Sequence, residues 1–387
     1  MNTLLEFLHS DLFFMIWTTL AKSAGLLGVV LGMVSYTVYA ERRVSSLMQD
    51  RLGPNRTGFP ISVVGSWLGQ KGWKDWSPIL GGLGQPIADA LKLLLKEDFT
   101  PAYVKKFYYW IAPALGIAAA IIALAVIPFG SSIAGVDMVI AKLDIGPLFI
   151  FAISSLGVYG IVLAGWSANS KYPFLGAIRS TSQLISYELA LGLSVVPLFL
   201  IIGKLNLVEI VSYQVQNGWM LLPGLTAAKP HLAHWTAYLL LVPVAISFLV
   251  FTIAMFAETN RLPFDLPEAE TELVGGYHTE YSSMKFALFF LGEYTAMITG
   301  SSLIVTLFLG AWHCPFIPDG SQGWFWGLVN IGVFFAKVFA FLIFFIFIRW
   351  TLPRFRYDQL MRLGWIWLFE IALVNIFLTA LIVAFVH

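Results

Sequence analysis

The 387-residue sequence has one cysteine, Cys314, and few charged residues, which make up only 12% of the chain. A single thiol excludes an intrachain disulfide and a CxxC-type zinc or iron–sulfur site, so any redox centre is expected on a partner chain. The net charge of +1 gives no indication of nucleic-acid binding. The N-terminus lacks the basic region and cleavage site of a signal peptide, so its first apolar run is expected to remain a membrane helix.

Apolar residues are what the sequence has in excess. They make up 58% of the chain, with 32 phenylalanines and 14 tryptophans, and the mean hydropathy is +0.80. Because apolar runs of about 20 residues cross a bilayer as helices, the pattern predicts an all-α polytopic membrane protein. We expect one membrane domain over 1–387, a bundle of about eight transmembrane helices, with interfacial amphipathic helices. The predicted spans are 12–40, 107–129, 147–168, 184–203, 237–257, 285–311, 325–349 and 365–386.

Lysine and arginine are distributed unevenly between the two sides of these spans. Eighteen of them lie in the four loops 41–106, 169–183, 258–285 and 349–364. The opposite loops contain only Lys142, Lys204 and Lys229. The positive-inside rule places the four basic loops in the cytoplasm and both termini outside. We expect a multi-pass protein of the bacterial inner membrane, and favour the mitochondrial inner membrane less.

Six carboxylates fall between Glu258 and Glu280, in the acidic cytoplasmic loop 258–285. If LPEAETELV is helical, Glu268 and Glu272 share a face. Two carboxylates about 6 Å apart repel by roughly 3 kcal/mol at an effective dielectric of about 20, which raises one pKa by about two. The alternative is a solvated acidic face that attracts a basic partner. The apolar flanks and two prolines weigh against that alternative.

Several ionisable residues lie inside predicted spans. Glu188 and Glu293 each lie at some depth from the cytoplasmic side, and Lys337 lies near the midplane. Intramembrane charges are costly and so predict a function, although a protonated acid can also serve helix packing. Lys337 requires a buried partner or a neutral state. Glu370 lies closer to a predicted helix end, where it can snorkel or contact a neighbouring subunit.

The loop 41–106 contains the segment QPIADALKLLLKED, whose apolar residues recur at helical spacing. This spacing predicts an interfacial amphipathic helix, with Asp89 on its polar face, either salt-paired or functional. Basic residues at the ends of the spans fit anchoring by lipid phosphates. Their mixture with Gly, Pro and aromatic residues also suits the wall of a partly apolar cavity. These basic residues are Arg42, Arg43, Arg51, Arg56, Arg354 and Arg356.

The segments AERR, RLGPNR, QPIADALKLLLKED, SQLISYELALGL, AETNRLPFDLPEAETELVGGYHTEY and RWTLPRFRYDQLM occur in this order between about residues 12 and 364. In this order they resemble the family of quinone-chamber membrane subunits of respiratory complex I, the NADH:quinone oxidoreductase. The resemblance implies an eight-helix component of an enzyme complex that seals a quinone chamber and begins a chain of acids toward the proton pumps.

Residues matching the family's motifs take on its roles by resemblance. The proton-coupling acids would be Asp89, Glu188, Glu258, Glu268, Glu270, Glu272, Glu280 and Glu293. The quinone chamber would include Arg42, Arg43, Arg51, Arg56, Phe264, Arg354 and Arg356. No cofactor is expected on this chain. Quinone is the implied substrate, and FMN and iron–sulfur clusters are implied on soluble partner subunits at the cytoplasmic side. Small and antiporter-like membrane subunits and lipid are the other implied partners.

Two departures from the family's pattern stand out. The connection near 57–81 is about 20 residues longer than usual, which affects the quinone entrance. After DQLM, the family continues toward WKxLLP, whereas this chain has MRLGWIWLFE and introduces Glu370. The last span is therefore expected to contact its surroundings differently.

Two other functions fit parts of the pattern. A membrane-bound hydrogenase has a related membrane component that shares the acidic loop, and a nickel protein among the copurifying partners would distinguish it. A free-standing ion transporter would be active alone in liposomes. The RLGPNR and PRFRYDQLM segments favour the quinone function.

Overall fold

The computed structural model describes residues 11–55, 57, 82–133, 135–223, 235–317 and 323–386. Within them, eight helices are long and apolar enough to cross a membrane. The predicted all-α polytopic class is thus confirmed. The spans are α2 (Asp11–Met48), α5 (Lys106–Leu124), α6 (Gly146–Ser167), α7 (Lys171–Ile202), α10 (Trp235–Glu258), α12 (Ser283–Phe308), α13 (Trp324–Thr351), and the run of α14 (Tyr357–Arg362), the π-helix η4 (Leu363–Leu368) and α15 (Phe369–Val386).

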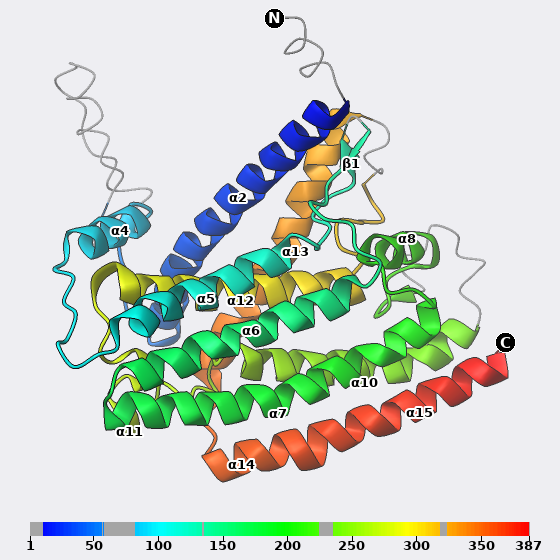
Figure 1. Ribbon diagram of the computed structural model, residues 1–387. Coiled ribbons are helices and arrows are strands. Elements are labelled where there is room, and N and C mark those ends of the chain that lie inside the picture. Colours follow the sequence, from blue (N-terminus) through cyan, green and yellow to red (C-terminus); the bar gives the residue numbers. More distant parts are fainter. Residues whose placement is uncertain are drawn as a thin grey trace, which may run out of the picture.

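Short elements connect the spans. The expected amphipathic helix is confirmed as α4 (Gln85–Leu95), on which Leu91, Leu94 and Leu95 are exposed. The helix α8 (Leu207–Asn217) and the antiparallel pair β1 (Ser132–Ile133) and β2 (Val136–Asp137) lie at the opposite side, as Figure 1 shows. The acidic loop contains the one-turn helix α11 (Glu270–Leu273) and the 3₁₀ helix η2 (Gly276–His278).

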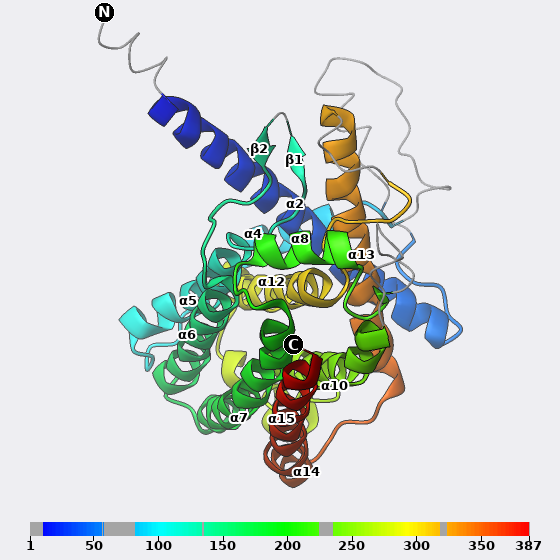
Figure 2. The ribbon, with the colours of Figure 1, turned by 90° about the vertical axis from the view of Figure 1, so that its right-hand side faces the viewer.

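Helix α12 is the centre of the bundle. It packs against α5, α13, α2 and α10, and nearly every residue after Gly292 is buried. In Figure 2 it lies in the middle, with α5, α6 and α7 on one side and α10 and α13 on the other. Any ionisable residue on α12 is therefore surrounded by protein rather than lipid.

Three spans extend well beyond the hydropathy limits, and one of them is the last span, which begins at Tyr357 instead of 365. Helix α2 continues to Met48, and α7 begins at Lys171 instead of 184. The first half of α7 is too polar to register as a span, but its polar side chains face protein. Gln183 is fully buried and donates to the Ala257 carbonyl at 2.9 Å and to Asn260 Oδ1 at 3.1 Å. Hydropathy measures the preference for lipid, so it misses a helix whose polar face is buried in protein.

Lys337 of α13 has the buried partners that its depth requires. Its ammonium donates to the carbonyls of Leu309, Ala311 and His313 at 2.8, 2.9 and 2.7 Å, and lies 4.1 Å from the ring centre of Trp219. These carbonyls belong to the turn just after the C-terminus of α12, where the helix dipole also favours a cation. Lys337 thus binds at the C-terminal end of the central helix.

We expect Lys337→Met to destabilise the bundle by about 2 to 3 kcal/mol, because three buried carbonyls would lose their donor. The midpoint of thermal denaturation of the purified protein should fall. Lys204→Met is the matched control, since Lys204 is exposed and pairs only with Glu209. Equal midpoints for the two variants would contradict the capping role.

Candidate functional site

A larger and a smaller cavity lie along α12, and the larger one, with a volume of about 640 Å³, lies between α2, α4, α12 and α13. Its wall combines apolar side chains such as Val38 and Phe290 with charged ones. Asp89 of α4 pairs with Arg42 of α2 at 2.8 Å. The other ionisable residues on the wall include Tyr39, Glu41, Lys92, Lys96, Tyr294 and Arg349.

The smaller cavity, of about 130 Å³, lies between α5, α6, α7, α10 and α12. Glu258, Glu293, Asn260 and Tyr277 bring polar atoms to an otherwise apolar wall. One water needs roughly 10–15 Å³ of such space and two to four polar partners. The cavity therefore has room for several waters near the two acids.

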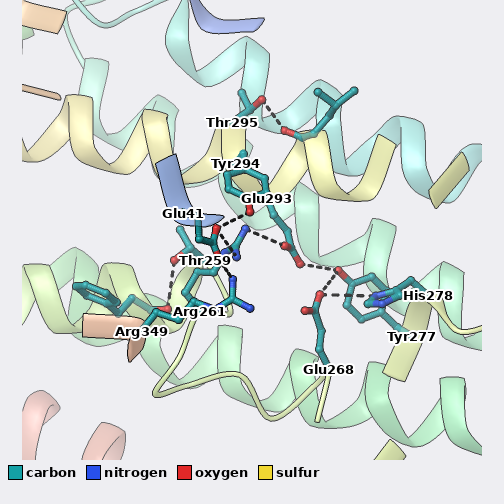
Figure 3. Close-up of polar contacts among 12 residues, drawn as sticks. Glu41, Thr259, Arg261, Glu268, Tyr277, His278, Glu293, Tyr294, Thr295 and Arg349 are labelled. Atoms are coloured by element: carbon teal, nitrogen blue, oxygen red, sulfur yellow. Dashed lines mark hydrogen bonds and ion pairs between the residues drawn. The ribbon is translucent and has the colours of Figure 1, made fainter. Parts of the chain in front are cut away.

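Arg261 lies between the two cavities, and its side chain is only 8% exposed. Its guanidinium is 3.8 Å from Glu41, which lines the larger cavity, and 3.5 Å from Glu293, which lines the smaller one. It also lies 4.3 Å from the ring centre of Tyr294, whose hydroxyl donates to Glu41 at 2.6 Å. Arg349 forms a second ion pair with Glu41. Figure 3 shows these contacts, which involve the consecutive residues Glu293 and Tyr294 of α12. Glu293 lines the smaller cavity and Tyr294 the larger one.

A hydrogen-bonded chain continues from Glu293 into the acidic loop. The Tyr277 hydroxyl is 3.1 Å from Glu293 and 3.3 Å from Glu268 (Figure 3). One hydroxyl has one proton to donate, so both contacts are hydrogen bonds only if one of the acids is protonated. Burial raises the pKa of Glu268 above its ordinary value and that of Tyr277 well above 10.0. His278 Nδ1 lies 3.6 Å from Glu268.

The loop after α10 is folded by packing as well as by charge. Phe264 is buried between the rings of Tyr187 and Phe355, at 5.4 and 5.5 Å between ring centres. Next to it, Asp265 accepts from Arg354 at 3.1 Å. Gly276 has a φ of +62°, and a Cβ there would lie 1.8 Å from the Pro267 carbonyl oxygen. Glycine is therefore required where the loop turns back and places Tyr277 beside Glu293.

One expectation for the acidic loop is wrong: Glu268 and Glu272 do not share a helix face. The helix α11 starts only at Glu270, because Pro267 and the turn after it keep Glu268 outside. Glu268 faces Tyr277, whereas Glu272 is 56% exposed and accepts from Arg179 at 2.6 Å. The side chain of Glu270 lies outside the described set.

The remaining predicted acids occupy separate places. Glu258 lines the smaller cavity and is near enough to Glu188 of α7 for their charges to interact. Glu280 accepts from Tyr103 at 2.8 Å, away from both cavities. Within the described residues, no group of three or more His, Cys, Asp or Glu side chains is suited to a metal ion.

Of the residues predicted for the chamber, Arg42 lines the larger cavity. Arg354 instead pairs with Asp265, and Phe264 packs against Phe355, so both residues hold the acidic loop in place. The others are Arg43, which lies against Gly53, Arg51, which donates to Gln49, and Arg356, which pairs with Asp358 at the surface. Arg56 and residues 58–81 of the long connection lie outside the described residues.

Sequence reasoning did not single out Glu41, Arg261, Tyr277, Tyr294 or Arg349. Four of them, Glu41, Arg261, Tyr277 and Arg349, lie in the motifs AERR, AETNR, GGYHTEY and RWTLPRFR, respectively. Each of these motifs also contains a predicted site residue. Their role depends on contacts between helices, such as that of Glu41 with Arg349, 308 positions apart. A search for buried arginine beside acidic motifs would have found Arg261.

The fold and the site together define a multi-pass helical membrane protein with a buried charge network between two cavities. A family profile described as NADH dehydrogenase matches residues 21–380. The chain is 45% identical over 364 residues to an NADH-quinone oxidoreductase subunit of Geobacter metallireducens, covering 93% of this chain and 94% of that protein. It is 44% identical to a corresponding protein of Geobacter sulfurreducens, with 95% and 96% covered, and 43% identical to one of Rhodothermus marinus, with 95% and 97% covered. The chain belongs to the NADH dehydrogenase family of membrane subunits.

Asp265 makes the stability of the acidic loop after α10 depend on pH. Burial raises the pKa of Asp265 from 3.8 to about 6, and Arg354 opposes the rise. The folded protein thus binds this proton more tightly than the unfolded chain, so the contribution to stability is complete at low pH and is lost as the pH rises from 3.8 to about 6. We expect an infrared band of a protonated carboxyl to disappear near pH 6 and to be missing in Asp265→Asn.

Glu272→Gln is the matched control, since it alters an exposed acid of the same loop that also pairs with an arginine. It should keep the band. A band that persists in Asp265→Asn would show that another acid titrates there.

Proposed function

We propose that this chain is the membrane subunit of a proton-pumping NADH:quinone oxidoreductase that builds part of the quinone chamber and couples quinone reduction to proton translocation. The observation that carries the proposal is the shared position of Arg261. One guanidinium lies 3.8 Å from an acid of the larger cavity and 3.5 Å from an acid of the smaller one. A change of charge in either cavity therefore alters the electrostatic potential at the acid of the other cavity.

The larger cavity suits a quinone. Its volume of about 640 Å³ lies within the range of roughly 300–1,000 Å³ usual for small-molecule sites. Apolar walls from α2 and α12 suit a prenyl-like chain, and the Arg42 guanidinium, which has donors besides the one paired with Asp89, can donate a hydrogen bond to a ring oxygen. Two electrons and two protons convert a quinone to a quinol. The electrons would come from iron–sulfur clusters on a soluble partner, and the relatives are named as NADH-quinone oxidoreductase subunits.

Electrostatics supplies the coupling step. Negative charge on a reduced quinone in the larger cavity would draw Arg261 toward that side and away from Glu293. Glu293 would then lose its counter-charge in a poorly solvated place, which favours its protonation. In the opposite direction, a proton taken by Glu41 would release Arg261 to Glu293 and favour the ionised acid. The single cation acts as a switch between two acids.

Tyr277 gives the proton a route once Glu293 changes state. Its hydroxyl contacts both Glu293 and Glu268, so a proton can pass between them through one phenol without crossing an apolar gap. The smaller cavity then leads from Glu293 to Glu258, and Glu188 lies beyond it. We propose that this row of acids begins the proton path toward other membrane subunits, with the basic loops in the cytoplasm and both termini outside.

Replacement of the shared cation tests the coupling. We expect Arg261→Gln to lower quinone reduction and proton uptake into vesicles together, each at least tenfold. Removing one partner of a buried ion pair costs about 3–5 kcal/mol. Electron transfer from NADH to a water-soluble acceptor would report that the complex is assembled. The control is Arg179→Gln, which removes an arginine paired with the exposed Glu272. Normal quinone reduction in Arg261→Gln would contradict the coupling role.

Blocking the larger cavity tests where quinone binds. Ala90 and Ala88 both lie on α4, but only Ala90 is on the cavity wall. We expect Ala90→Trp to raise the KM for a short-chain quinone at least fivefold, because the indole would fill the space. Ala88→Trp, with the same change of volume, should keep the KM. Similar KM values in the two variants would place the quinone elsewhere.

A further inference from the structure

Glu370 is an exposed carboxylate on a membrane-spanning helix. The sequence placed the last span at 365–386, with Glu370 near its end, but the span begins at Tyr357 and ends at Phe385. This run is about 40 Å long at 1.5 Å per residue, longer than the roughly 30 Å of hydrocarbon in a bilayer, and its polar first turns end at Arg362, so Glu370 lies about 12 Å into the apolar part. It makes no hydrogen bond or ion pair with the described residues. Arg362, the basic residue on the same helical run, is about 12 Å away along the axis.

The orientation of α15 is fixed, so Glu370 cannot turn inward. The inner face of the helix packs on α7 and α10. Asn375 donates to the Pro243 carbonyl and to Ser247, both at 2.9 Å, and Ala372 and Thr379 are buried on the same side. In Figure 1, α15 forms the edge of the bundle, and its outer side faces away from every other helix.

The outer side of α15 has a regular pattern. The exposed residues between Trp367 and Leu381 include a row at alternating steps of three and four, a spacing that keeps one stripe facing a second helix. Glu370 occupies the second position of this stripe. Its members are Trp367, Glu370, Val374, Phe377 and Leu381, and the four apolar ones are 55%, 63%, 68% and 56% exposed. We name these five residues the α15 seam.

We propose that the α15 seam binds a transmembrane helix of another subunit of the complex, and that this helix places a basic or amide side chain against Glu370. An ionised carboxyl facing lipid at this depth is costly, whereas a polar partner in a neighbouring helix satisfies it. The apolar members suit the apolar surface of a membrane helix, and the polar partner that Glu370 needs can come from such a helix but not from lipid chains. The inference rests on the proposed function only for the existence of partner subunits.

Photo-crosslinking in native membranes tests the occupant. A photoreactive amino acid in place of Phe377 should give one protein adduct, in which the crosslinked peptide is an apolar segment of another subunit of the complex and contains Lys, Arg, Asn or Gln. Glu370→Leu should lower the adduct yield at least fivefold, and Glu370→Gln, which keeps an acceptor, should lower it less. Glu209→Leu, which removes an exposed acid on α8, is the control and should keep the yield.

Three outcomes would overturn the proposal: adducts with lipid only, adducts with a second copy of this chain, or an unchanged yield in Glu370→Leu. If Glu370→Leu prevents assembly, Glu370→Lys is combined with an acid in place of the basic residue found in the adduct. Recovery of the adduct supports the proposal, and no recovery overturns it. The Arg261→Gln variant separates the two proposals, because it should lose quinone reduction and still form the adduct.

Discussion

The guanidinium of Arg261 holds two buried carboxylates, Glu41 and Glu293, that belong to different cavities. Without that charge, Glu293 would have no paired cation among the described residues, and a buried carboxylate needs one to remain ionised. Arg349 assists only on the side of Glu41. The path between the cavities therefore depends on one side chain, and the surrounding structure serves to keep it in place.

Several features of the fold serve that purpose. Phe264 anchors the loop after α10 in an aromatic cluster, and Gly276 lets the same loop return so that Tyr277 meets Glu293. Central α12 supplies Glu293 and Tyr294 to opposite cavities, and Lys337 secures its far end. The rigid helix and the folded loop together set distances that a mobile loop could not keep.

The sequence predicted the membrane class, the eight spans and the amphipathic helix with useful accuracy, because lipid imposes length and hydropathy on each segment separately. It also identified the acidic loop. It was wrong about Glu268 and Glu272, since that expectation took the whole segment LPEAETELV to be helical, whereas the helix begins only at Glu270. It overlooked Arg261, whose importance comes from two acids that lie on other helices.

The sequence by itself determined which segments enter the membrane and where charge is concentrated, since these properties are local to each segment. The tertiary structure alone decided which charges meet. Glu41 and Arg349 lie 308 positions apart in the chain, and Glu293 and Tyr294 are neighbours that face different cavities. The ionisation of a buried acid depends on the nearest opposite charge and on the exclusion of water, and both are set by the packing of the helices.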